Sequence, residues 1–471
     1  MRSTMMNTRF FLAGAAMALP LAAHAQQAPA NLLPEEKPQT VAESFAGDPD
    51  YDAPTADTPV ATPAQLSAPA DEAATVQQIS PDVQNWPVEH AMALADLLEG
   101  IASEGLNPAD YNAGGLRAIA LQGPGALLDT EASKRFAWLI EDMRDGRTPM
   151  NARKQWFVMD PDADRYRTGE IMEQALASGD LAGALQTVAP EHPDYARLRE
   201  ELAGVDRNSE RGKLIRANMD RWRWLPRDLG SQYLITNVPE YLLRLTVNDN
   251  IVRTYRTIVG KPGRTATPQL AESVEGVILN PTWTVPQSIV KGEGLGARVL
   301  ANPSWARAKG YTATKGANGW VSVVQQPGPT NSLGKMKLDM PNRHAIFFHD
   351  TPSRGLFKNS ARALSHGCIR TERADELALT LAILQAGLTA EEGVEKLASG
   401  KYTRVGFEKR MPAYITYFTM AQDINGRLTT FNDIYERDKP VLDSLDAPRV
   451  ANRSRVTDEQ IIVIEDDPRA T

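Results

Sequence analysis

Cysteine is almost absent from this sequence, which has 471 residues and only one cysteine, Cys368. A lone cysteine cannot close a disulfide within the chain, so a fold stapled by disulfides is excluded. Histidine is scarce as well, with six in the chain. The paired spacing of cysteines and histidines that marks a strong zinc motif is also missing.

Positive charge is in deficit, since 51 Lys and Arg stand against 59 Asp and Glu for a formal net charge of −8. No basic stripe runs along the chain, which excludes binding to a nucleic-acid backbone and argues against anionic lipid surfaces. After the N-terminal region, no apolar run approaches the ~18 residues of a membrane helix. The sequence therefore predicts neither a nucleic-acid partner nor a transmembrane segment.

The N-terminal region has the pattern of an export signal. Residues 1–25 combine a basic start at Arg2 and Arg9, an apolar run and a small-x-small site that ends at Ala25. This pattern predicts a signal peptide, and its removal brings the net charge to −10. No cysteine follows the site, which excludes a lipoprotein. An unpaired thiol in an oxidising compartment is a liability, so we expect Cys368 to have a function.

The region after the predicted signal peptide divides by composition into a linker and a helical domain. Residues 26–80 are rich in Ala, Pro, Gln, Thr and Asp with almost no aromatics, which predicts a disordered linker. Residues 81–204 carry apolar stripes at helical spacing and are expected to form an all-helical scaffold domain. The two clearest stripes are Leu94, Leu97, Leu98 and Ile101, and Phe136, Leu139, Ile140 and Met143.

Strand patterns dominate the second half of the chain. Alternating residues on both sides of Asn248-Asp249-Asn250 predict a hairpin, and a second is predicted at Asp423-Ile424-Asn425-Gly426. Residues 205–438 are therefore expected to form a mostly-β domain, and the charged residues 439–471 a flexible C-terminal tail. The predicted fold class is α+β. Near the junction, Arg221-Trp222-Arg223-Trp224 predicts packing between the two domains, with a carbohydrate platform as the alternative.

One stretch concentrates the reactive residue types. It is His349-Asp350-Thr351-Pro352 followed by Ser365-His366-Gly367-Cys368-Ile369-Arg370. With His344 just before it, this region holds three of the six histidines within 23 positions. Residues 345–348 predict a short buried strand that ends at His349. A helical pattern after Thr371 places Cys368 just before a helix N-terminus, where the partial positive charge favours a thiolate. A base at the end of a strand would then face a nucleophile at the start of a helix.

Two other interpretations of this stretch are open. A lone cysteine is often a small, inert hydrophobic residue in a core. A zinc site built from His344, His349, His366 and Cys368 is a second alternative, although the spacing of a strong zinc motif is absent.

At these residues the chain resembles a known family. The run from His349 to Arg370 is similar to the H-x(14–17)-[ST]-H-G-C signature of L,D-transpeptidases. The resemblance covers about residues 205–438 and is greatest for the Gram-negative branch with a helical scaffold. It implies a mostly-β L,D-transpeptidase catalytic domain in the periplasm. Two departures stand out: no small peptidoglycan-binding domain is expected between scaffold and catalytic domain, and Arg370 stands where many members have Asn.

The resemblance implies acyl transfer on peptidoglycan. Cys368 would attack a tetrapeptide stem, release D-Ala and form a thioester, which an amine of a second stem would resolve into a 3→3 cross-link. His349 would be the base, oriented by the backbone carbonyl of Asp350. Ser365, His366 and Gly367 would form the nucleophile loop, with the N–H groups of Gly367 and Cys368 as the oxyanion hole. No metal and no organic cofactor is implied.

Further roles follow from the same resemblance. Residues 286–320 would be a lid over the site, expected to be mobile and mostly irregular. The expected substrate-binding residues are Arg370, Asn331, Trp305 and Tyr311. Arg370 has two equal interpretations: it could bind a carboxylate of the stem peptide, or it could hold the nucleophile loop.

Three other functions stay open from the sequence. Water could resolve the thioester, which would make the protein an L,D-carboxypeptidase. The acceptor could be an outer-membrane protein that becomes attached to peptidoglycan. In a different class, the chain could be a non-catalytic wall-binding module. The expected partners are donor and acceptor stem peptides, with other cell-wall enzymes as further candidates.

Overall fold

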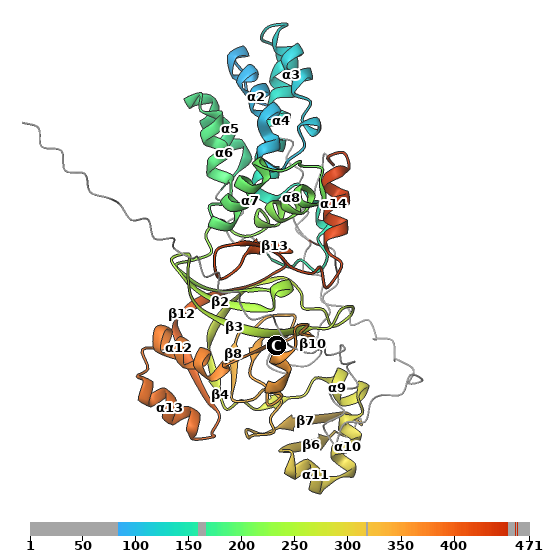
Figure 1. The fold of residues 1–471 in the computed structure, drawn as a ribbon, viewed down its shortest axis with the longest axis vertical. Helices are drawn as coiled ribbons and strands as arrows, with labels where there is room; N and C mark the ends of the chain where they lie inside the picture. Colours follow the sequence, from blue (N-terminus) through green and yellow to red (C-terminus); the bar gives the residue numbers. More distant parts are fainter. Residues whose placement is uncertain (1–82, 159–165, 317–318, 451–456, 458, 460–471) are drawn as a thin grey trace, which may run out of the picture. The chain divides into compact units, whose positions relative to one another are not determined.

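The computed structural model of this protein describes residues 83–158, 166–316, 319–450, 457 and 459. The predicted signal peptide and linker lie outside these residues. Within them, helices form the N-terminal part and strands the part after residue 231 (Figure 1). No helix among the described residues is long and apolar enough to cross a membrane.

The helical part contains seven α-helices among the residues described from 83 to 222. They are α2 (Val88–Gly100), α3 (Ala113–Ala120), α4 (Ala126–Asp145), α5 (Thr168–Ser178), α6 (Leu181–Val188), α7 (Pro193–Ala203) and α8 (Glu210–Trp222). The stripes expected from the sequence are largely buried: Leu94, Leu98, Phe136, Leu139 and Ile140 are fully enclosed. Together with residues of α3, α5 and α6 they form one core, which is the stabilising feature of this part.

The second part is built on a nine-stranded sheet. Its order is β10-β3-β11-β9-β8-β4-β12-β1-β2, and β2 also pairs with β3, so the order closes on itself. Closure removes the free sheet edges that would otherwise invite pairing with other chains. The strands are β1 (Gln232–Asn237), β2 (Leu242–Val247), β3 (Asn250–Gly260), β4 (Leu270–Leu279), β8 (Met336–Asp339), β9 (Phe348–His349), β10 (Ala363–Ser365), β11 (Ile369–Thr371) and β12 (Thr403–Thr416).

Both hairpin turns expected from the sequence are present. Asn248 and Asp249 have φ of 48° and 58°, the left-handed values that a two-residue turn between β2 and β3 requires. The second turn joins β13 (Met420–Gln422) to β14 (Leu428–Thr430).

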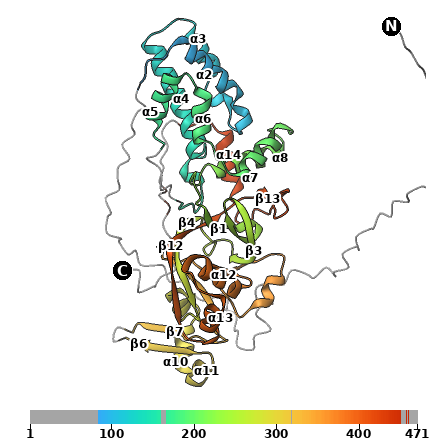
Figure 2. The same cartoon turned by 90° about the vertical axis from the view of Figure 1, so that its left-hand side faces the viewer.

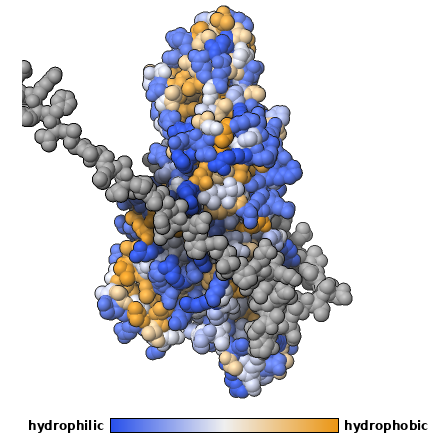
Figure 3. Space-filling view, viewed as in Figure 1, coloured by the Kyte–Doolittle hydropathy of each residue, from blue (hydrophilic) through white to orange (hydrophobic). Residues whose placement is uncertain are grey.

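Two helices, α12 (Ala374–Ala386) and α13 (Ala390–Ala398), follow β11 along the chain. The buried face of α12 includes Leu377 and Leu381 and joins the core of the sheet. Other apolar side chains of these helices are exposed. Leu384 is 49% exposed, and Ile383 and Val394 are also exposed. Figure 3 shows apolar surface in the region where Figure 1 places these two helices.

The helical prediction just after Cys368 is wrong in one respect. Residues Ile369–Thr371 form β11, which pairs with β3 and β9, and α12 begins only at Ala374. Cys368 therefore precedes a strand and not a helix N-terminus, so no helix dipole acts on its thiol.

The segment predicted to be an irregular lid is folded. It contains α9 (Gln287–Gly292), α10 (Leu295–Ala301) and α11 (Pro303–Ala308), beside the sheet of β5 (Trp283–Thr284), β7 (Val321–Gln325) and β6 (Tyr311–Lys315). Figure 2 shows these elements grouped together. Val285, Val290, Val299, Ala306 and Val323 give this insertion a small core of its own, which is why it is not irregular. Its expected role as a lid stays a prediction.

The start of the C-terminal region is folded, although its charged composition predicted a flexible tail. Residues Asp438–Asp446 form α14, whose Val441 and Leu445 are buried with α7 and α8. Beyond it, Arg449 donates to the buried carboxylate of Asp142 from Nε (2.8 Å) and Nη2 (3.1 Å). The prediction of a flexible tail is therefore wrong for residues 439–449, because two apolar side chains and an ion pair anchor them.

A segment between the helices reaches the sheet. The N–H of Phe157 donates to the carbonyl of Gln269 (3.0 Å), and the N–H of Gln269 donates to the carbonyl of Gln155 (2.9 Å). The Phe157 ring lies 4.4 Å from the His344 ring. Residues 155–157 thus add backbone pairing just before β4 and contact the stretch that carries the histidines.

We predict that Arg449→Ala lowers the free energy of unfolding by about 3 kcal/mol, since it removes the Arg449 guanidinium from the buried Asp142 carboxylate. Urea denaturation would measure this change. The control is Arg117→Ala, whose partners Asp96 and Glu99 are exposed, and it should leave the free energy of unfolding nearly unchanged. Equal stability of Arg449→Ala and wild type would mean that the tail is loose after all.

Candidate active site

The pairing of β9 with β11 brings the reactive residues together. These strands are parallel, with Phe348 opposite Ile369 and His349 opposite Arg370. Phe348 and Ile369 are fully buried in the core. Because side chains alternate along a strand, His349 and Arg370 face away from the core. Cys368 lies one residue before β11 and packs against the core, where the charge of Arg370 still acts on its thiol. Lys337 of β8 pairs with His349 and brings a second cation to this face.

The Cys368 thiol is half-buried. Its Sγ lies 3.6 Å from the carbonyl oxygen of Ala345, at the end of the segment that leads into β9. Burial raises the pKa of the thiol, while a backbone hydrogen bond from Phe347 and the charges of Lys337 and Arg370 oppose that rise. The thiol is therefore mainly protonated at neutral pH and needs a base to react.

His349 has the protonation state of such a base. Its Nδ1 lies 2.5 Å from the backbone carbonyl oxygen of Asp350. A carbonyl oxygen only accepts, so Nδ1 carries the proton and Nε2 keeps a free lone pair. Burial and the Arg370 charge lower the pKa of His349 to about 3, so the ring is neutral at neutral pH. The contact with Asp350 expected from the sequence is present; the role of the ring stays a prediction.

Asp350 is held so that its carbonyl cannot turn. Its N–H donates to Met336 O (2.9 Å) and its carboxylate accepts from Lys335 N (2.9 Å). Arg354 Nη2 donates to the same carboxylate (3.1 Å). Gly334 leaves room for that carboxylate, because a Cβ there would come within 2.3 Å of Oδ2. The His349 ring is therefore oriented through a fixed backbone.

Hydrogen bonds shape the loop that carries the nucleophile. Ser365 Oγ donates to the carbonyl of Cys368 (2.6 Å) and accepts from the N–H of Gly367 (3.1 Å). Gly367 has φ of 125°, which side chains rarely allow. Its carbonyl accepts from Thr267 Oγ1 (2.8 Å), and the same hydroxyl accepts from the N–H of Gly260 (2.9 Å). Thr267 thus ties the loop to the end of β3.

These bonds correct the expected oxyanion hole. The N–H of Gly367 already donates to Ser365, so it is not available to a developing oxyanion. Within the described residues the N–H of Cys368 has no such partner and remains the donor of the pair. Gly367 therefore shapes the loop, and the N–H of Cys368 stays the predicted donor to an oxyanion.

His366 points away from the thiol toward the insertion. Its side chain is 46% exposed, and Nε2 lies 2.9 Å from Glu293 Oε1 at the end of α9. This contact joins the insertion to the nucleophile loop through two side chains. It supports the expectation that His366 shapes the loop and does not take the thiol proton.

The expected substrate-binding residues are not brought together. Asn331 is fully buried, and its amide bonds the carbonyls of Pro281 and Gln326 (both 3.0 Å), so it holds a loop and cannot meet substrate. Trp305 and Tyr311 stack on each other within the insertion, with ring centres 5.6 Å apart. Arg370 alone stands at the thiol face, and among the described residues its guanidinium has no hydrogen-bond or ion-pair partner.

The geometry also bears on the zinc alternative. His344 packs on Phe157, His349 bonds a backbone carbonyl and His366 pairs with Glu293. In the described part of the chain, no three His, Cys, Asp or Glu side chains converge as metal ligands do.

Sequence patterns did not identify Thr267, Lys337 or Glu293. Each lies outside the signature and reaches the site through sheet pairing or the insertion.

The charge environment of the thiol gives a prediction. Lys337→Met removes a cation that lowers the pKa of Cys368, so the thiolate fraction at pH 7.5 should fall and alkylation by iodoacetamide should slow by about threefold or more. Because Cys368 is the only cysteine, total alkylation reports this site alone. Lys335→Met, at an exposed neighbour, is the matched control. Identical rate-versus-pH curves for wild type and Lys337→Met would refute this electrostatic account.

The support from Thr267 gives a second prediction. Thr267→Val keeps the shape but removes the hydroxyl that bonds Gly367 and Gly260. Alkylation of Cys368 should change in rate or in apparent pKa, while Thr267→Ser should restore wild-type behaviour. If valine behaves like threonine, the loop does not depend on this bond.

Comparison with known proteins agrees with this organisation. Residues 231–390 match the family model of the YkuD L,D-transpeptidase catalytic domain, and residues 83–202 match a scaffold domain. A protein of Haemophilus influenzae named "Putative L,D-transpeptidase" is 29% identical over 285 residues, which are 57% of this chain and 57% of that protein. The chain thus spans little more than half the length of this curated relative.

Solved structures that the chain is similar to have low sequence identity and low TM-scores. L,D-transpeptidase from Mycobacterium smegmatis is 11% identical, over 40% of this chain and 58% of that chain, with a TM-score of 0.22. A cysteine-to-serine mutant of Enterococcus faecium L,D-transpeptidase is 14% identical, over 41% and 52%, with a TM-score of 0.20. TM-scores this low do not support a family assignment, so the family of this chain is assigned from the two family models. On that basis the chain carries a YkuD-type L,D-transpeptidase catalytic domain preceded by a scaffold domain.

Proposed function

We propose that this protein is a peptidoglycan L,D-transpeptidase that forms 3→3 cross-links through a thioester on Cys368. The observation that carries the proposal is the proximity of Cys368, His349 and Arg370, which combines a nucleophile, a neutral base and a cation that has no hydrogen-bond or ion-pair partner among the described residues. The export signal expected in residues 1–25 supports a periplasmic location, where the stem peptides are.

The first half-reaction follows from the protonation states. His349 Nε2 takes the thiol proton as Sγ attacks the carbonyl of the L-centre of the third stem residue. The tetrahedral oxyanion receives the N–H of Cys368. As the C–N bond breaks, the imidazolium returns its proton to the amine of D-Ala, which leaves, and the thioester remains. The proton taken from the thiol is thus the proton given to the leaving group.

The second half-reaction reverses these roles. A neutral amine of a second stem attacks the thioester, and His349 accepts its proton. The C–S bond breaks, an amide forms, and the thiolate recovers the proton. Atoms and charge balance without an added cofactor.

Arg370 is assigned to binding the donor. Its guanidinium lies on the thiol face and makes no hydrogen bond to the loop among the described residues, which favours the first of its two interpretations. A guanidinium suits the terminal carboxylate of the stem, because its parallel N–H groups can donate to both oxygens.

Product analysis tests the proposal. Full-length mature protein would be incubated with tetrapeptide muropeptides, and intact-mass spectrometry would follow wild type beside Cys368→Ala. We expect a thioester adduct and a dimer that lacks one D-Ala, both lost in the mutant. Only tripeptide monomer would indicate the carboxypeptidase, and an adduct that transfers only to a protein amine would indicate attachment of an outer-membrane protein.

Absence of any adduct or product would leave the wall-binding module as the better account. Labelling by a carbapenem gives an independent check, because an acylating thiol should form a covalent adduct on Cys368 and a binding module should not.

The pH dependence follows from the shifted pKa values. Since burial lowers the pKa of His349 to about 3, the ring stays neutral from pH 5 to pH 8 and its protonation removes no activity in that range. The raised pKa of Cys368 keeps the thiol protonated over the same range, so the reacting pair of neutral thiol and neutral ring is fully populated and the acylation rate should be nearly level from pH 5 to pH 8. Initial rates in buffers of equal ionic strength would show this. A limb near pH 6.5 would mean that His349 titrates as an ordinary imidazole.

A further inference from the structure

The turn between β3 and β4 holds the nucleophile loop at two points. The N–H of Lys261 donates to the carbonyl of Ser365 (3.0 Å), and the Thr267 hydroxyl donates to the carbonyl of Gly367 (2.8 Å). These two carbonyls belong to residues that come shortly before Cys368 in the chain. The position of the two ends of this turn therefore sets the path of the backbone that leads into the nucleophile.

One hydroxyl joins the two ends of the turn. Tyr435 Oη donates to the carbonyl of Gly260 (2.5 Å), the residue before Lys261, and accepts from the N–H of Thr267 (3.3 Å). Burial raises the pKa of Tyr435 to about 12, so the hydroxyl keeps the proton that it donates at neutral pH. Tyr435 thus bonds the first and the last part of the turn at the same time.

The backbones at this junction are in direct contact. A Cβ at Gly260 would come within 1.8 Å of the carbonyl oxygen of Thr265, so the turn lies directly on the end of β3. Closely packed groups transmit a displacement to their neighbours. A turn that loses the bonds of Tyr435 would therefore move Lys261 and Thr267, and with them the nucleophile loop.

The Tyr435 ring is itself held in place. Its backbone N–H donates to Tyr417 Oη (2.8 Å), and that hydroxyl donates to Asp433 Oδ1 (2.5 Å). The two tyrosine rings stack with their centres 5.6 Å apart, and the Arg437 guanidinium lies 4.8 Å from the centre of the Tyr435 ring. These contacts fix the position in which the ring presents its hydroxyl.

The same support extends to the helical part. The Asp433 carboxylate accepts from the N–H of Asp438 (2.8 Å), and the Asp438 carboxylate accepts from Arg221 Nη1 (2.6 Å) in α8. Arg221 is the first residue of the Arg-Trp-Arg-Trp motif for which the sequence predicted packing between the two domains. A chain of hydrogen bonds therefore connects this motif to Tyr435.

The Trp222 ring of that motif is not a sugar platform. It is stacked between His192 (centres 4.1 Å apart) and Phe418 (4.5 Å), so both of its faces are covered. The carbohydrate platform considered from the sequence needs an open aromatic face. Trp222 instead packs the two parts of the chain together.

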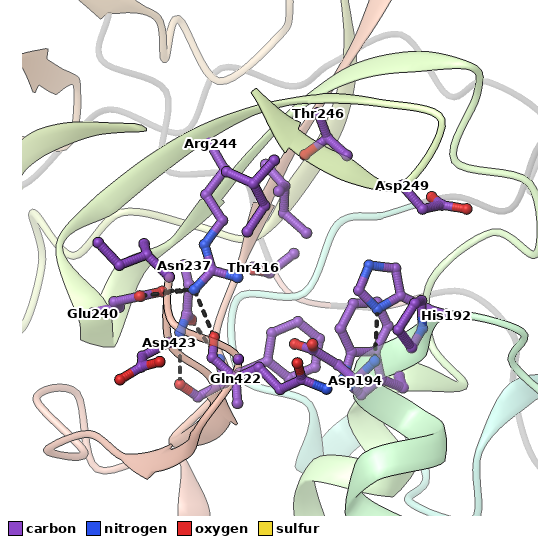
Figure 4. A pocket seen from close by; sticks show the side chains of 18 of the residues that line it. His192, Asp194, Asn237, Glu240, Arg244, Thr246, Asp249, Thr416, Gln422 and Asp423 are labelled. Atoms are coloured by element: carbon purple, nitrogen blue, oxygen red, sulfur yellow. Dashed lines mark hydrogen bonds and ion pairs between the residues drawn. The ribbon is translucent and has the colours of Figure 1, made fainter. Parts of the chain in front are cut away.

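A second tyrosine hydroxyl lies far from the nucleophile loop and serves as a control. Tyr233 lines the cavity of Figure 4, where its Oη donates to Asp249 Oδ1 (3.1 Å). Asp249 comes just before β3, whereas Gly260 is the last residue of that strand. At the rise of an extended chain, the 11 residues of β3 separate these two positions by roughly 30 Å.

We propose that Tyr435 is a positioning residue for the nucleophile, because its hydroxyl fixes the turn that holds the loop of Cys368. The hydroxyl acts through Gly260 and Thr267 and not on the reacting atoms. The consequence for the reactivity of the thiol needs no substrate, and only the consequence for acylation rests on the proposed function.

Alkylation of the full chain by iodoacetamide, followed from pH 6 to pH 9.5, tests this inference in Tyr435→Phe. Phenylalanine keeps the ring and removes both bonds of the hydroxyl. A loosened loop admits water to a thiol whose pKa burial raises, so the measured pKa of Cys368 should fall. Alkylation at pH 7.5 should then be at least about threefold faster than in wild type. Tyr233→Phe should follow the wild-type curve.

Thioester formation with a tetrapeptide donor gives a second measurement. Tyr435→Phe should slow this step at saturating donor by about fivefold or more, because the thiol is less well placed. The donor concentration that gives half the maximal rate should stay nearly unchanged, since no contact with the donor is removed. Urea denaturation of each variant checks that it is fully folded under the assay conditions.

The double variant Tyr435→Phe/Thr267→Val shows whether the two residues act as one unit. If they do, the second change should add little to the first. The inference is overturned if Tyr435→Phe gives the wild-type alkylation curve, if Tyr233→Phe changes that curve equally, or if the two single effects simply add.

A second variant is available if Tyr435→Phe fails to fold. Arg437→Lys keeps the charge but loses the planar group beside the Tyr435 ring, and it should change the alkylation curve in the same direction. A wild-type curve for a folded Arg437→Lys would then overturn the inference. Absence of a thioester in wild type would contradict the proposed function alone, because the alkylation curves decide this inference without a substrate.

Discussion

The parallel pairing of β9 with β11 is the constraint on which the rest of the site depends. It buries Phe348 and Ile369 in the core, and by alternation it turns His349 and Arg370 to the opposite face, next to Cys368 just before β11. A shift of one residue in either strand would turn the imidazole or the guanidinium into the core. Burial of two large apolar side chains therefore provides the free energy that fixes the catalytic geometry.

Around this pairing, backbone groups do most of the positioning. A carbonyl orients His349, and Ser365 and Thr267 hold the nucleophile loop through its own carbonyls. Thr267 also links outward: its carbonyl lies 3.4 Å from Arg437 Nη2, and Arg437 also bonds Gln155 from the helical part. Arg437 thus connects Gln155 of the helical part to Thr267, the residue that holds the nucleophile loop.

How much the sequence could predict depended on the range of the interactions. The spacing of His349 and Cys368 identified the reactive pair, because the signature is local and its residue types are restrictive. Hairpin turns at Asn248 and Asp423 were predicted for the same reason. Thr267 and Lys337 could not be predicted, since both reach the site from distant segments: Thr267 by a hydroxyl hydrogen bond to Gly367, and Lys337 by the pairing of β8 with β9.

The errors have a similar origin. The helix was expected to begin at Thr371 but begins at Ala374, because apolar spacing cannot show that residues 369–371 form a strand between β3 and β9. Residues 439–449 were expected to be loose because their charge hid the anchoring of Val441, Leu445 and Arg449. Asn331 was expected to bind substrate, but its amide donates hydrogen bonds to loop carbonyls.

The most direct measurement of the central claim is the rate of thioester formation with a tetrapeptide donor alone, for wild type beside His349→Gln. Intact mass at early times would follow the adduct, and peptide mapping would locate it. A neutral base that activates a protonated thiol predicts an adduct on Cys368 that forms at least about 100-fold more slowly in His349→Gln. Equal rates in the two proteins, or an adduct on another residue, would contradict the account.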